Sequence, residues 1–163
     1  MLPIRTILCP VDFSENSKPA FQLACALARD YKARLHVVNV APLPGFYGEG
    51  IVIVRTEKAK EEALSQLKDL QASEPSLEMQ YHLREGEPSL EILETAKRIK
   101  SDLVVMGTHG WTGLNRLLMG SVAEQVMRKA TCPVLTINGK AHVNAESPKE
   151  AKKTHEKALA GTT

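Results

Sequence analysis

The sequence has few of the features that would assign it to a specialised class of protein. Aromatic residues make up only 4% of its 163 residues, which disfavours a surface that stacks nucleic-acid bases. The formal net charge is +2, too small to favour nucleic acid or a membrane surface as the main partner. No apolar run approaches the roughly 18 residues needed to span a bilayer. These absences favour an ordinary globular protein.

Cysteine is also scarce. Cys9, Cys25 and Cys132 are odd in number and widely spaced, and no CxxC pair occurs. Such a set indicates neither a disulfide framework nor a zinc site, and it favours a reducing compartment. The N-terminal stretch MLPIRTILCPVDFS contains no apolar signal core, so we expect a cytoplasmic protein.

The residues that are present fit one globular domain. A chain of this length with 43% hydrophobic residues can bury a real core. Beyond residue 138 the sequence turns polar, with five lysines and three glutamates, and no strong apolar period continues. We therefore expect a domain over residues 1–138 and a flexible polar tail over residues 139–163.

Short apolar runs alternate with stretches of helical periodicity along the expected domain. The run that contains CPVD is followed by SENSKP, where Ser14 is a candidate N-cap for the first helix. The segment PLPGFYGEG is predicted to be a loop. Strands are predicted at residues 4–11, 34–41, 77–84, 102–106 and 132–137, and helices at about 20–31, 52–72, 88–100 and 120–130.

This alternation predicts an α/β fold built from parallel βαβ units with right-handed crossovers. The fully apolar strands at 4–11 and 102–106 belong at the centre of the sheet, whereas the half-polar strand at 77–84 belongs at an edge. The order 3-2-1-4-5 satisfies both conditions and gives a Rossmann-like, doubly wound, five-stranded parallel sheet with helices on both faces. Ligands of such sheets bind at the switch point, here between the strands that end at Asp12 and Gly107.

The segment MGTHGWTGLNRLLMGS, residues 106–121, follows one of these central strands and contains four glycines. Gly107 and Gly110 permit unusual backbone conformations and let N–H groups approach a phosphate. Gly120 and Ser121 begin the next helix, where unpaired amides and a positive dipole attract anions. A turn followed by a simple helix cap is the alternative. The segment matches neither a Walker A loop nor GxGxxG.

The spacing G-x2-G-x9-G-S in this segment resembles the nucleotide-binding signature of the universal stress protein family. The resemblance covers nearly all of residues 3–138. Three further stretches carry it: ILCPVDFS, EGEPSLEILETAK and DLVVMGTHGWTGLNRLLMGSVAEQVMRKATCPVLTI. The resemblance implies an α/β fold with five parallel strands and, as is common in the family, a homodimer. Because the signature is present, the sequence resembles the branch of the family that binds ATP.

The resemblance also implies roles for individual residues. Asp12 would accept hydrogen bonds from the ribose hydroxyls. Val11 departs from members of the family that have a hydroxyl residue there. The rest of the implied set is Pro10, Val11 and the backbone of Val37 for the adenine, Met106, Gly107, His109 and Gly110 for the ribose and phosphates, and Gly120, Ser121, Val122 and Ala123 for the phosphate chain.

The sequence is compatible with three functions. The first is an ATP-binding stress-response module that acts as a homodimer through the last strand, Val134–Ile137. The second is a slow ATPase or phosphotransfer enzyme, although the loop has no lysine and no evident base to orient water. The third is a dimeric scaffold that needs no nucleotide. No pair of His, Asp or Glu has metal-ligand spacing, so Mg²⁺ or Mn²⁺ would arrive with the phosphates.

Overall fold

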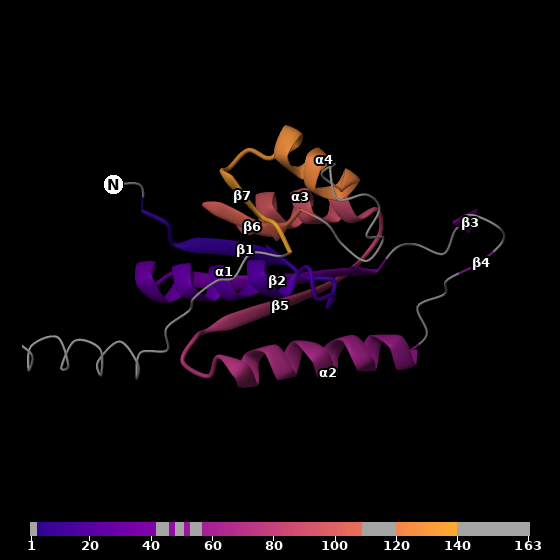
Figure 1. Cartoon of the computed structure of the whole chain (residues 1–163), viewed down its shortest axis with the longest axis horizontal. Coiled ribbons are helices and arrows are strands. Elements are labelled where there is room, and N and C mark those ends of the chain that lie inside the picture. Colours follow the sequence, from indigo (N-terminus) through magenta and orange to yellow (C-terminus); the bar gives the residue numbers. More distant parts are fainter. Residues whose placement is uncertain (1–2, 42–45, 48–50, 53–56, 109–119, 140–163) are drawn as a thin grey trace, which may run out of the picture.

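The computed structural model describes residues 3–41, 46–47, 51–52, 57–108 and 120–139 (Figure 1). Its main sheet has the order β5-β2-β1-β6-β7 and every neighbouring pair is parallel, which confirms the predicted order 3-2-1-4-5. The strands of this sheet are β1 (Thr6–Pro10), β2 (Arg34–Ala41), β5 (Met79–Glu85), β6 (Leu103–Gly107) and β7 (Val134–Ile137).

A short antiparallel pair, β3 (Phe46–Tyr47) and β4 (Ile51–Val52), forms where the sequence predicted a loop followed by the start of a helix. Each of the two strands has two residues. The prolines and glycines of PLPGFYGEG favoured a loop in the sequence, although Phe46 and Tyr47 lie among them. The prediction was therefore wrong for Phe46–Tyr47, which fall in the expected loop, and for Val52, where the helix expected at about 52–72 was to begin; α2 begins at Glu57.

Helices cover both faces of the sheet (Figure 1). The helices α1 (Lys18–Tyr31) and α2 (Glu57–Ser73) pack on one face. The helices α3 (Pro88–Arg98) and α4 (Ser121–Lys129) pack on the other. The doubly wound architecture follows, because β1 is followed by a helix on one face and β6 by a helix on the opposite face.

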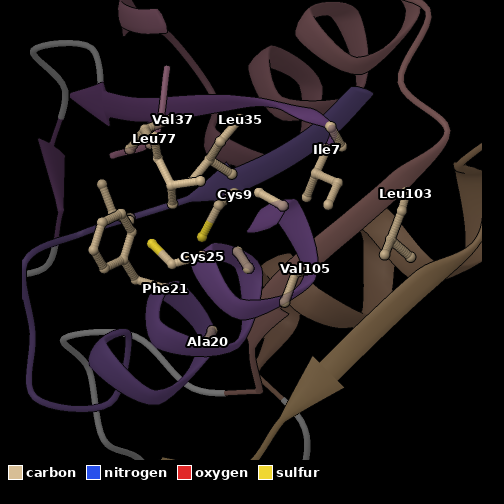
Figure 2. Packing of buried hydrophobic residues seen from close by; sticks show 14 of the residues in the cluster. Ile7, Cys9, Ala20, Phe21, Cys25, Leu35, Val37, Leu77, Leu103 and Val105 are labelled. Carbon is tan, nitrogen blue, oxygen red and sulfur yellow. The ribbon is translucent and has the colours of Figure 1, made fainter. Parts of the chain in front are cut away.

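The strand β1 shows why its residues form a central strand. Ile7 and Cys9 point into the cluster under α1, and Leu8 points into the cluster under α3 and α4. All three side chains are fully buried, so each side of the strand must be apolar. Figure 2 shows the first cluster, which contains the side chains of both Cys9 and Cys25.

The start of α1 differs from the prediction. Ser17, not Ser14, occupies the N-cap position, and its side chain makes no capping bond. The Ser14 hydroxyl instead donates to Asp12 Oδ1 over 2.6 Å, while the Ser14 carbonyl accepts from the Ser17 amide. The Asp12 carboxylate is the stronger acceptor for this hydroxyl. Ser14 therefore belongs to the turn that precedes the helix.

Candidate functional site

The predicted switch point lies at the carboxyl ends of β1 and β6. Ile7 pairs with Leu103 and Leu8 pairs with Val104, so the residues that follow Pro10 lie level with the residues that follow Met106. From this edge the chain goes to α1 on one face and, after β6, to α4 on the other. The two connections leave a notch between neighbouring strands, which is where ligands bind in such sheets.

Asp12 lies at this edge with its carboxylate held in place. Its Oδ1 accepts hydrogen bonds from the Ser14 amide, at 3.0 Å, and from the Ser14 hydroxyl. The next residue, Phe13, has a φ of 62°, a conformation that a bulky side chain rarely adopts. The ring of Phe13 packs against the core under α1, which explains how this backbone is held. Residues with such uncommon backbone angles cluster at binding sites, where the surrounding fold holds the backbone and the neighbouring functional group in place.

The start of α4 is tied back to the end of β6. The Gly120 amide donates to the Thr108 carbonyl over 2.8 Å, and the Thr108 amide donates to the Ile137 carbonyl over 2.9 Å. Thr108 and Gly120 therefore lie side by side at the sheet edge. This places the first turn of α4 beside the notch.

The first turn of α4 carries open amides. Gly120 takes the N-cap position with an extended backbone, at φ −61° and ψ 146°, and has no side chain with which to cap. In the described part of the chain, the amides of Ser121, Val122 and Ala123 have no backbone or side-chain acceptor. Unpaired amides at a helix N-terminus and the positive end of its dipole together make an anion site. Glu124 also lies in this turn and partly opposes that field.

Val37 does not reach the notch. It lies in the middle of β2, level with Cys9 and Tyr81, and its side chain is fully buried. Residues of a strand turn their N–H and C=O groups alternately to the two sides. The Leu35 amide and the Ala41 carbonyl both bond toward β5, so the backbone groups of Val37, which has the same parity, also face β5. The Val37 backbone therefore faces β5 rather than the notch.

Val40, rather than Val37, turns its backbone groups toward the notch. The carbonyl of Val38 accepts from the Val11 amide, so even-numbered residues of β2 face β1. Two residues later β1 has ended, and the N–H and C=O of Val40 face the space beyond its last residue, Pro10. Sequence reasoning missed Val40 because only the register reveals which residue outlasts the neighbouring strand.

Asn39 supports the same edge. Its side chain is buried, and its Nδ2 donates to the Val11 carbonyl over 2.9 Å. This bond fixes how the chain leaves β1 just before Asp12. The signal in the sequence is a polar residue among apolar neighbours in VVNVA, residues 37–41.

The remaining residues of the predicted set divide by burial. Val11, Met106 and Ala123 are buried; Pro10, Gly107, Gly120 and Val122 are partly buried; Ser121 is exposed. The structure brings all of these to the sheet edge or to the first turn of α4. His109 and Gly110 lie outside the described residues.

Neither a metal cluster nor a membrane-spanning helix occurs among the described residues. No group of three or more His, Cys, Asp and Glu side chains there could hold a metal ion. None of the helices in the described ranges is long and apolar enough to cross a bilayer.

Comparisons with known proteins agree with this geometry. The universal stress protein family matches residues 3–138. A universal stress protein of Methanocaldococcus jannaschii is 40% identical over 138 residues, which cover 82% of this chain and 81% of that protein.

Two solved structures share the fold. A universal stress protein in complex with cAMP aligns with a TM-score of 0.66 and 21% identity, over 85% of this chain and 100% of that one. A universal stress protein from Archaeoglobus fulgidus in complex with dAMP aligns with a TM-score of 0.61 and 24% identity, over 85% and 100%.

Proposed function

The chain belongs to the universal stress protein family, and on this premise we propose that it binds ATP in the notch between β1 and β6. The bound nucleotide makes it a regulatory module of the stress response. One observation carries the proposal: the open first turn of α4 is tied to Thr108 at the sheet edge where Asp12 also lies. The two fold relatives that hold cAMP and dAMP support a purine nucleotide as the class of ligand.

The phosphate chain would lie against the first turn of α4. The amides of Ser121, Val122 and Ala123 and the Ser121 hydroxyl supply donors, and the helix dipole adds a positive potential. His109 and Gly110 complete this set in the proposal, as the family signature implies. These neutral donors suit phosphate oxygens, and Mg²⁺ or Mn²⁺ would arrive on the phosphates to supply the remaining positive charge.

The ribose and the adenine would occupy the other end of the notch. The oriented carboxylate of Asp12 accepts from the ribose hydroxyls. The Val40 backbone offers a carbonyl and an amide side by side, which match the amino group and the ring nitrogen on one edge of adenine. Pro10, Val11 and Met106 supply apolar surface near the base. Val40 replaces Val37 in the proposed set.

The proposed assembly is a homodimer through β7. This strand pairs only with β6 within the described sheet, so its outer edge is open to a second copy. Leu135 is 37% exposed there. In sedimentation at micromolar concentration we expect a dimer, and Leu135→Glu should shift it toward monomer. A native protein that sediments as a monomer would contradict the assembly without touching nucleotide binding.

The cytoplasm is the proposed compartment. All three thiols are free, and two of them are buried in the core rather than paired as a disulfide. Reduced cysteines are typical of proteins that work in a reducing compartment.

Thermal unfolding with ATP and Mg²⁺ tests the binding proposal. At 100 times its Kd, a ligand that binds only the folded state adds about 2.7 kcal/mol of stability. We expect a corresponding rise in the Tm of the native protein, lost in Asp12→Ala and Gly120→Val. Asp30→Ala, an exposed residue near the far end of α1, is the matched control and should keep the rise. Absence of any rise at millimolar ATP in the native protein would refute the proposal.

A further inference from the structure

Two histidines meet between the edge strand β5 and its neighbour β2. His36 Nδ1 and His82 Nε2 are 2.9 Å apart, and the two rings stack with centroids 5.2 Å apart and planes 9° from parallel. His82 pairs in register with Val38, so His36 and His82 are diagonal neighbours on the sheet face that α3 covers. His36 is 6% exposed and His82 is partly buried. The pair lies before the carboxyl edge and is not part of the nucleotide notch.

The short contact depends on the protonation state of both rings. A neutral imidazole has one donor and one acceptor nitrogen, so one ring can donate to the other. One added proton still leaves a donor facing an acceptor. A second proton makes both nitrogens donors, which removes the hydrogen bond and sets two positive charges against each other.

The surroundings oppose protonation from three elements. Arg34 of β2 and burial lower the pKa of His36, with burial the larger cause. Burial also lowers the pKa of His82, followed by His36 itself, Arg98 of α3 and Arg84 of β5. Arg84 in turn donates from Nε to the Glu91 carboxylate of α3 over 2.9 Å.

The direction of the pH effect follows from these lowered pKa values. Below the ordinary histidine pKa of 6.5, the unfolded chain takes up protons that the folded pair resists. The stability that the neutral pair contributes is therefore complete above pH 6.5. It is lost as the pH falls from there through the folded-state values.

We propose that the His36–His82 pair is a proton-responsive latch, which holds the edge strand β5 on β2 at neutral pH and loosens it on acidification. β5 is the outermost strand on its side of the sheet and has no second neighbour in the described sheet. Tyr81 of this strand donates to Gln71 of α2 over 3.1 Å, so loosening extends to the helix that packs there. The latch responds to protons with or without nucleotide.

Amide hydrogen exchange of the nucleotide-free protein tests the latch. Between pH 7.5 and pH 5.0, after correction for intrinsic exchange, the protection of β5 amides should fall by at least about tenfold, while β1 keeps its protection. In the double variant His36→Gln/His82→Gln the fall should stay within about twofold. His142→Gln removes a histidine outside the family-matched range and should behave as the native protein does.

A second measurement keeps the test decisive if the double variant does not fold. Titration of the histidine rings by NMR in the native protein should give both members of the pair pKa values below 6.5. In His36→Gln the pKa of His82 should rise toward that value, because one opposing charge is gone. A ring of the pair that titrates at or above 6.5, or β5 protection that does not change with pH, would overturn the proposal.

Discussion

Replacing Gly120 by Asp or by Asn separates the charge of the α4 N-terminus from its geometry. Gly120 has the extended backbone that any N-cap residue adopts, so neither substitution strains the chain. Asp and Asn are both better N-caps than glycine, and each should stabilise the helix by a few tenths of a kcal/mol. Both side chains accept from the same first-turn amides, and they differ almost only by one negative charge.

The expected loss of nucleotide affinity follows from Coulomb's law. Asp at this position sets a carboxylate against phosphate oxygens that would share the same amides. Two unit charges about 4 Å apart repel by about 1 kcal/mol in water and by about 4 kcal/mol near a protein surface. We therefore expect ATP to bind between about fivefold and about a thousandfold more weakly to Gly120→Asp than to Gly120→Asn.

Isothermal titration with ATP at several salt concentrations measures this difference. Because the screening length falls from about 10 Å at 0.1 M to about 3 Å at 1 M, the gap between the two variants should narrow as salt rises. Urea unfolding of both variants provides the control, since each should be at least as stable as the native protein. Equal affinities at low salt would show that the phosphates do not lie at this helix terminus.

Two further predictions concern the core and the turn before α3. Burial raises the pKa of Cys25 to about 12 and raises that of Cys9 even further. At pH 8 a chromogenic thiol reagent should therefore label Cys132 alone until the protein is unfolded. Rapid labelling of all three cysteines in the folded protein would contradict the packing. Gly86 has a φ of 154°, and a Cβ there would lie 2.8 Å from Cγ of Glu91, so Gly86→Ala should lower the free energy of unfolding by about 1–3 kcal/mol in urea.

The strand order was predictable because the residue types of each strand indicate whether one or both of its sides are buried. The run ILCP can be buried on both sides, and LVVM can too, whereas MQYHLR alternates. The order 3-2-1-4-5 places the first two inside the sheet and the third at an edge, and it is a doubly wound order. The structure confirms it, and the alternating strand is β5, the outermost on its side.

The candidate site was less predictable, because it depends on register. Pro10 and Asp12 could be placed from the end of an apolar run. Whether Val37 or Val40 presents its backbone to the notch depends on which carbonyl of β2 bonds to Val11, and no pattern of side chains encodes that. The capping of α1 failed for a similar reason, since the competing acceptor for Ser14 lay two residues before it.

Two helices begin at the same sheet edge, and they treat their first turns differently. α3 begins with its own anion, because the Glu87 carboxylate accepts from the Leu90 amide and from the Ser89 hydroxyl, each over 2.7 Å. α4 begins with Gly120, which has no side chain. A helix N-terminus carries roughly half a positive charge. That of α3 is neutralised within the protein, whereas that of α4 has no capping side chain, which supports the proposed phosphate site there.

The same reasoning decides between the notch and the hollow beside α3. That hollow has a volume of about 450 Å³ and contains cationic side chains, which could suggest a phosphate site. However, Arg84 is bonded to Glu91 at 2.9 Å and Lys60 lies 3.8 Å from Glu85, so each cation already faces a carboxylate. A phosphate entering there would have to displace these partners and approach two negative charges. Among the described residues of the first turn of α4, Glu124 is the one acidic side chain, so the nucleotide phosphates should be found beside β6 rather than beside β5.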